Sequence, residues 1–129
     1  MRVTPMRRTT VLFVDDDEFI RGAYGDLLRD EGFSVVEAAD GHEALLAATA
    51  IAGDVLLVLD DEMPRMRGLE VLDRIDGRPD AARFRVVIIS GSGNADLYTL
   101  PRRGLRVQAV VPKPFTADEL LSTLHKLAA

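Results

Sequence analysis

The sequence lacks cysteine, a long apolar run and any excess of basic residues, and each absence excludes a class of protein. Without cysteine there is no disulfide framework, which fits a reducing compartment. No apolar run is long enough to cross a bilayer, and residues 1–10 have no apolar core of the kind that a signal peptide needs. The formal net charge of −5 argues against nucleic acid, whose phosphates are bound through Lys and Arg. We therefore expect a cytoplasmic protein that binds neither membranes nor nucleic acid.

The length and the hydrophobic content indicate a single domain. A chain of 129 residues, 47% of them hydrophobic, can build one core but not two ordinary ones. We expect a short N-terminal lead over residues 1–9 and one domain over residues 10–129. Within that domain, apolar runs typical of strands alternate with segments of helical periodicity. The expected strands are residues 10–14, 34–38, 55–59, 86–89 and 107–111.

Several helix boundaries are visible in the sequence. Asp40 followed by Glu43, and Thr116 followed by Glu119, match the capping box that begins a helix. Gly32 is expected to end the first helix. Strands that alternate with helices, three of them apolar on both faces, predict an α/β fold in which a parallel sheet is covered on both sides.

The stretch "VLFVDDDEF" places four acids directly after an apolar strand, where mutual repulsion and burial would both be unfavourable. In parallel α/β sheets, ligands bind at the carboxyl ends of the strands. Several polar residues follow those ends, and all of them should meet at one edge of the sheet: Asp15 and Asp16, Asp60 and Asp61, Ser90, and Lys113. Asp17 is the better candidate to cap the first helix.

These side chains suit phosphoryl chemistry. Carboxylates with room for water are the ligands that Mg²⁺ prefers, and a carboxylate can also act as a nucleophile toward phosphorus to form an aspartyl phosphate. Lys113 and the hydroxyl of Ser90 could bind the oxygens of the transferred group. A divalent cation between the first and third strand ends would explain why the acids are tolerated there.

The chain resembles the receiver domain of a two-component response regulator. The matching segments are the acids of "VDDD", the segment "LDDEMP", the strand end "IISG" and the motif "VPKPF". The resemblance implies a flavodoxin-like, doubly wound sheet of five strands in the order 2-1-3-4-5. It also implies a domain that is not an enzyme in the ordinary sense, because it catalyses only its own phosphorylation and dephosphorylation.

The same resemblance assigns roles to individual residues. Asp60, four residues before Pro64, matches the phosphoacceptor, and Asp15 and Asp16 match the acids that bind Mg²⁺ together with it. Ser90 matches the Ser or Thr that responds to phosphorylation, and Lys113 the lysine that contacts the phosphate. The backbone carbonyl of Glu62 falls where the family supplies a further metal ligand. The bond from Lys113 to Pro114 matches one that is usually cis.

The implied partners are a sensor histidine kinase or a phosphotransfer protein that supplies the phosphoryl group, and an unidentified protein that receives the output. The sequence also departs from the pattern. Val110 stands where many receivers have a switching Tyr or Phe, so a switch would have to work through Ser90 or another element. Pro101 weakens the fourth helix, and the carboxylate of Glu62 could orient water or repel phosphate.

Two other interpretations remain open at this point. A receiver that is never phosphorylated could serve only as a protein-binding module. The Asp-x-Asp pattern of Asp15 and Asp17 also resembles the first motif of haloacid-dehalogenase-type phosphatases, although the chain is short for that family and has no cap region. Replacing Asp60 distinguishes these cases, because phosphate incorporation would vanish only in a true receiver.

Overall fold

The computed structural model describes residues 9–63, 65–91 and 95–128. In these ranges the chain forms β1 (Thr9–Val14), α1 (Glu18–Asp30), β2 (Ser34–Ala38), α2 (Gly41–Ala50), β3 (Asp54–Asp60), α3 (Gly68–Asp76), the 3₁₀ helix η1 (Ala81–Arg83), β4 (Phe84–Ser90), α4 (Ala95–Tyr98), β5 (Arg106–Pro112) and α5 (Ala117–Ala128). Residues 1–8 of the expected lead, and Pro64, lie outside the described residues, and Thr9 already belongs to β1.

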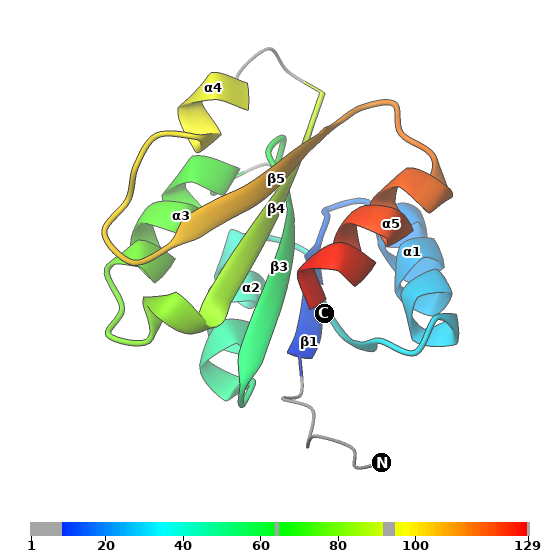
Figure 1. Ribbon diagram of the computed structural model, residues 1–129, viewed down its shortest axis with the longest axis horizontal. Helices are drawn as coiled ribbons and strands as arrows, with labels where there is room; N and C mark the ends of the chain where they lie inside the picture. Colours follow the sequence, from blue (N-terminus) through cyan, green and yellow to red (C-terminus); the bar gives the residue numbers. More distant parts are fainter. Residues whose placement is uncertain (1–8, 64, 92–94, 129) are drawn as a thin grey trace.

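The strands form one parallel sheet in the order β2-β1-β3-β4-β5, which confirms the predicted doubly wound α/β fold. The alternation of strand and helix along the chain produces this topology, because each helix carries the chain back to start the next parallel strand. All the carboxyl ends therefore meet at one edge of the sheet, where β3 and β4 end at the top of Figure 1.

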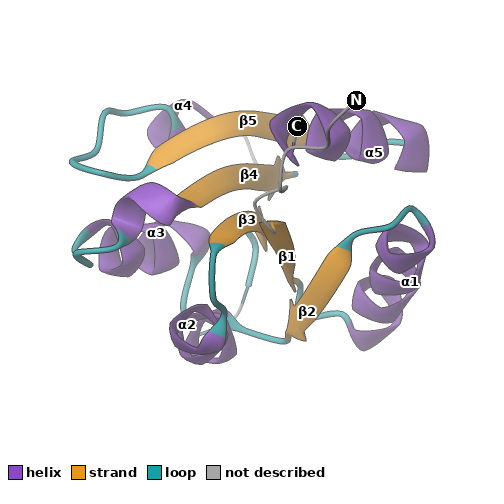
Figure 2. Ribbon diagram, turned by 60° about the horizontal axis from the view of Figure 1, so that its bottom comes forward, coloured by secondary structure: helices purple, strands orange, loops and turns teal. Residues whose placement is uncertain are grey.

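Helices cover both faces of the sheet, with α1 and α5 on one face and α2, α3 and α4 on the other (Figure 2). Alternate strand residues point to opposite faces. Leu56 and Val58 of β3 pack in the core under α1 and α5, and Leu57 and Leu59 pack in the core under α2, α3 and α4. We call these the α1/α5 face and the α2–α4 face.

The predicted helix starts are confirmed in their hydrogen bonds. Asp17 caps α1 by accepting the N–H of Ile20 at 3.0 Å. Thr116 and Glu119 form both bonds of a capping box before α5. Asp40 caps α2 as predicted, accepting the N–H of Glu43 at 2.8 Å.

The helix after β4 is short, as the sequence predicted. The last residue of α4 is Tyr98, and Pro101 follows in the loop that leads to β5. Gly32 takes the left-handed conformation, with φ of 94°, just beyond α1. None of the described helices is long and apolar enough to span a membrane.

Candidate functional site

The carboxyl edge of the sheet brings together the acids that the sequence singled out. Carboxylate oxygens of Asp15, Asp16 and Asp60 all lie within 4.8 Å of one another. Asp15 and Asp60 are buried, with 7% and 4% of their surface exposed, whereas Asp16 is exposed. Three carboxylates this close repel one another unless a cation is present. The cluster therefore has the composition and the spacing of a site for a hard divalent cation.

Backbone pairing fixes Asp15 at the end of β1. Its N–H donates to the carbonyl of Ala38 at 3.2 Å, and its own Oδ1 accepts the N–H of Asp17 at 2.8 Å. Burial raises the pKa of Asp15, the hydrogen bond from Asp17 opposes that rise, and the charge of Asp60 adds to it.

Lys113 supplies the positive charge of the site. Its Nζ lies 3.2 Å from both carboxylate oxygens of Asp60. The N–H of Lys113 donates to the carbonyl of Ser90 at 2.9 Å, which fixes the lysine just beyond β5, and the peptide bond to Pro114 is cis, as expected. Burial alone would lower the pKa of Lys113, but the charge of Asp60 and its hydrogen bond outweigh burial and raise it.

Glu62 contributes its backbone to the same site. Its N–H donates to Oδ1 of Asp60 at 3.0 Å, which orients the carboxylate of Asp60, and its side chain is exposed. The role of its carbonyl as a metal ligand stays a prediction.

The structure also gives a contact to Asp61, for which the sequence predicted a place at the sheet edge but no role. The hydroxyl of Ser90 donates to Oδ2 of Asp61 at 2.7 Å, and both residues are buried, with 5% and 7% of their surface exposed. Ser90 therefore reaches the predicted edge of the sheet, but this bond ties it to Asp61. The one signal in the sequence was a second acid after the strand, in "LDDEMP".

Strand alternation separates these residues into two groups. Asp60 continues the row of Leu56 and Val58, which belongs to the α1/α5 face. Asp61 continues the row of Leu57 and Leu59, which belongs to the α2–α4 face. Ser90 likewise follows Val86 and Ile88 of that second face. The acids and the lysine thus lie on one side of the sheet edge, and the Asp61–Ser90 pair lies on the other.

Tyr98 of α4 lines the same pocket as Asp61. Its side chain is only 3% exposed and belongs to the same core cluster that Val110 packs against. Burial, followed by the charges of Asp61 and Asp60, raises the pKa of Tyr98 to about 12. Val110 of β5 provides no aromatic ring at this edge of the sheet. The ring of Tyr98, from α4, lies near it instead.

Two pockets flank the edge. On the α2–α4 side, a pocket of about 400 Å³ is lined by Asp61, Glu62, Met63, Arg67, Leu69, Leu97 and Tyr98. Against the acidic cluster, a pocket of about 540 Å³ is lined by Phe13, Asp15, Ile20, Tyr24, Ile89, Gly91, Lys113, Pro114 and Phe115. The second pocket combines apolar walls with the ammonium group of Lys113.

Comparison with known proteins assigns the chain to a family. Residues 11–125 match the family described as "Response regulator receiver domain", and the chain belongs to it. The chain is 33% identical over 126 residues to the chemotaxis protein CheY of Listeria monocytogenes, which covers 92% of this chain and 97% of that protein. It is 31% identical over 121 residues to sporulation initiation phosphotransferase F of Bacillus subtilis, which covers 94% of each.

A solved structure of a related protein has the same fold. The chemotaxis response regulator CheY4 of Vibrio cholerae superposes with a TM-score of 0.80 at 27% identity, covering 93% of this chain and 98% of that one. Receiver domains bind Mg²⁺ at an acidic pocket and interact with histidine kinases or phosphotransfer proteins. The cluster of Asp15, Asp16 and Asp60 lies where this chain would form that pocket.

Proposed function

We propose that this domain accepts a phosphoryl group on Asp60 from the phosphohistidine of a sensor kinase or phosphotransfer protein, with Mg²⁺ required. The observation that carries the proposal is the position of Lys113, whose Nζ lies 3.2 Å from both oxygens of Asp60 while the carboxylates of Asp15 and Asp16 lie close by. Family membership supports it independently.

The donor atoms fit a magnesium ion. They are carboxylate oxygens, one of the three acids is exposed to water, and the set leaves room for the water ligands that Mg²⁺ retains. Asp15, Asp16 and Asp60 would hold the ion, with the carbonyl of Glu62 as the predicted fourth protein ligand. When bound, the ion supplies positive charge that offsets the charge of the transferring phosphoryl group.

In the proposed reaction, an oxygen of Asp60 attacks the phosphorus of the phosphohistidine. A phosphorus–oxygen bond forms, and the phosphorus–nitrogen bond breaks with its electron pair going to the imidazole nitrogen. Among the described residues, Oδ1 of Asp60 accepts bonds from both Lys113 and Glu62, whereas Oδ2 accepts only from Lys113, so Oδ2 is the less engaged nucleophile. The ammonium of Lys113 can then stay with the phosphoryl oxygens.

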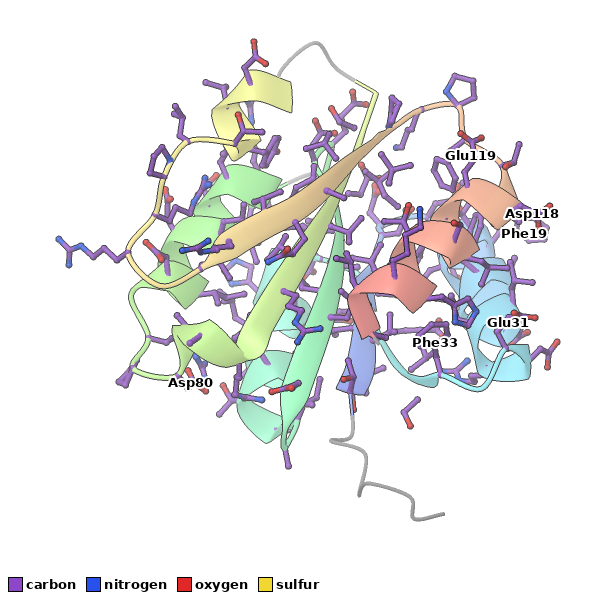
Figure 3. The ribbon with its side chains drawn as sticks, in the orientation of Figure 1. Phe19, Glu31, Phe33, Asp80, Asp118 and Glu119 are labelled. Carbon is purple, nitrogen blue, oxygen red and sulfur yellow. The ribbon has the colours of Figure 1, made fainter. Side chains whose placement is uncertain are left out.

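The apolar pocket beside the acidic cluster is where the donor protein would dock. Ile20 of α1 lines it with 41% of its surface exposed, and Phe19, the residue before it in α1, is 83% exposed. Phe19 lies at the outer edge of the molecule in Figure 3. Exposed apolar side chains around a phosphoacceptor allow a partner to bury surface while its phosphohistidine reaches Asp60.

The test is intact mass after incubation with acetyl phosphate, with and without Mg²⁺. We expect the addition of one phosphoryl group that needs Mg²⁺ and disappears in Asp60→Asn. The matched control is Asp73→Asn, which removes an exposed carboxylate of α3 and should label normally.

Two outcomes would contradict the proposal. Labelling that persists in Asp60→Asn and maps to Asp15 would favour a phosphatase-type nucleophile. The second outcome is an unmodified protein that neither labels nor binds beryllofluoride, a stable mimic of the aspartyl phosphate. Because beryllofluoride would bind even if the phosphorylated form were too short-lived to detect, this result would leave a protein-binding module that is never phosphorylated.

A further inference from the structure

The pair of Asp61 and Ser90 is built into the sheet rather than formed by mobile surface groups. The N–H of Asp61 donates to the carbonyl of Ile89 at 3.1 Å, so Asp61 extends the pairing of β3 with β4 by one residue. That pairing sets Asp61 beside Ser90 on the α2–α4 face. The Ser90 hydroxyl then meets the Asp61 carboxylate at 2.7 Å in a buried position.

A serine hydroxyl carries one proton and can donate only one hydrogen bond at a time. In this structure it donates to Asp61. If a phosphoryl group on Asp60 is to receive the same hydrogen bond, the bond to Asp61 must break first. A charged acceptor in a buried site holds such a proton firmly, because bonds to ionised groups are stronger and water competes poorly there.

The position of Asp61 fits a hydrogen-bonding role toward Ser90 better than a role in metal binding. The acids whose oxygens cluster within 4.8 Å, as far as the described residues go, are Asp15, Asp16 and Asp60. Asp61 follows the opposite row of strand residues and lines the pocket next to α4 together with Leu97 and Tyr98. It is thus one peptide bond from the phosphoacceptor but contacts the elements of the other face.

We propose that Asp61 is a positioning residue that retains Ser90 in the unphosphorylated arrangement and competes with the phosphoryl group for its hydroxyl. This inference depends on the proposed function, because the competitor is the phosphoryl group of Asp60. Asp61 lowers the fraction of molecules in the activated arrangement, and a ligand at Asp60 that needs the hydroxyl of Ser90 binds more weakly as a result. Release of Ser90 would leave Asp61, which lines the pocket next to α4, without this hydrogen bond.

The experiment measures the affinity of the Mg²⁺-loaded protein for beryllofluoride by calorimetric titration. Asp61→Leu removes the acceptor and matches the leucines that precede it on the same face. We expect roughly tenfold tighter binding than in the unmodified protein, a size typical of coupling between sites. Asp61→Asn keeps the shape with a weaker, uncharged acceptor and should give a smaller gain.

A double-mutant cycle separates retention of Ser90 from simple charge repulsion. Removing Asp61 also removes a negative charge near an anionic ligand, and that effect would be the same whether or not the hydroxyl is present. In a Ser90→Ala background only the charge effect remains, so we expect Asp61→Leu to gain clearly less affinity there than the roughly tenfold expected in the unmodified protein. An equal gain in both backgrounds would overturn the inference.

Further controls keep the outcome clear. Asp73→Asn removes one exposed carboxylate of α3 and should leave the affinity within about twofold. If circular dichroism shows that Asp61→Leu does not fold, the same cycle is run with Asp61→Asn. An unmodified protein that neither labels nor binds beryllofluoride refutes the proposed function, whereas one that binds normally but shows no gain in the Asp61 variants refutes only the retention of Ser90.

Discussion

Arg83, at the end of η1, makes an unusually large set of contacts for a surface arginine, and its replacement should be costly. Its guanidinium donates to Oδ2 of Asp80 at 2.8 Å and to the carbonyls of Gly53 and Ala48, each at 2.7 Å. It also lies 4.8 Å from the centre of the Phe84 ring. One side chain therefore ties together the end of α2, the loop before β3 and the start of β4.

The magnitude follows from these contacts. Each of the three hydrogen bonds contributes about 1 kcal/mol to the free energy of unfolding, and the contact with the ring adds about 0.5 kcal/mol. The ion pair with Asp80 is partly exposed and is counted only as one of those hydrogen bonds. We therefore expect Arg83→Met to lower the free energy of unfolding by about 3 kcal/mol, out of a total of roughly 5–15 kcal/mol for a domain.

The assay is urea unfolding followed by far-ultraviolet circular dichroism, because the chain has no tryptophan to report by fluorescence. For a slope of about 2 kcal/mol per molar urea, the midpoint should fall by roughly 1.5 M. The matched control is Arg74→Met, in an exposed part of α3, which should change the stability by less than about 0.5 kcal/mol. A loss of less than about 1 kcal/mol for Arg83→Met would refute the reasoning.

The same variant should keep the proposed phosphoacceptor chemistry. Asp80, the partner of Arg83, lies at the lower left of Figure 3, toward the amino-terminal edge of the sheet and away from the acidic cluster. At urea concentrations below its own unfolding midpoint, Arg83→Met should label on Asp60 to the same extent as the unmodified protein.

Three further predictions concern pH, packing and metal. Hydrogen bonds from two arginine side chains lower the pKa of Asp80, and backbone N–H groups of the loop before β5 lower that of Asp76, below the ordinary 3.8. The stability that these acids contribute is therefore complete above a pH of about 4 and is lost progressively as pH falls from there toward the folded-state values, so the urea midpoint should drop less between about pH 6 and about pH 2 in Asp80→Asn than in the unmodified protein. A Cβ at Gly68 would lie 2.9 Å from the Tyr98 hydroxyl, so Gly68→Ala should cost about 1–2 kcal/mol in urea unfolding, and less in a Tyr98→Phe background. Mg²⁺ at ten times its Kd should raise the free energy of unfolding by about 1.4 kcal/mol, a gain that Asp16→Asn should greatly reduce.

The fold and the membership of the acidic cluster were predictable because they depend on strand order rather than on fine geometry. Once the apolar runs are assigned to parallel strands, the residues after them must meet at one edge. Asp15, Asp60 and Lys113 are found together for that reason, and the cap formed by Asp17 was visible as an acid that precedes a helix.

The bond between Asp61 and Ser90 was not predictable in the same way. It depends on the exact register of β3 against β4, in which Asp60 is opposite Ile89, and on the face to which each side chain turns. The periodicity of the helical segments does not say which residues of two neighbouring strands are paired. The burial of Tyr98 was hidden for a similar reason, because α4 has only four residues and its packing depends on the loops on either side.

The arrangement explains how chemistry on one face of a sheet can affect the other. Asp60 turns toward the α1/α5 face with the acids and Lys113. The next residue, Asp61, turns toward the α2–α4 face with Ser90 and lines the pocket next to α4. Substitutions of Asp60 should therefore remove the proposed reaction, and substitutions of Asp61 should change how strongly that reaction is coupled to α4. Val110 provides no aromatic ring at this edge, but Tyr98 lines the same pocket as Asp61, so we expect the coupling to reach α4 through that pocket.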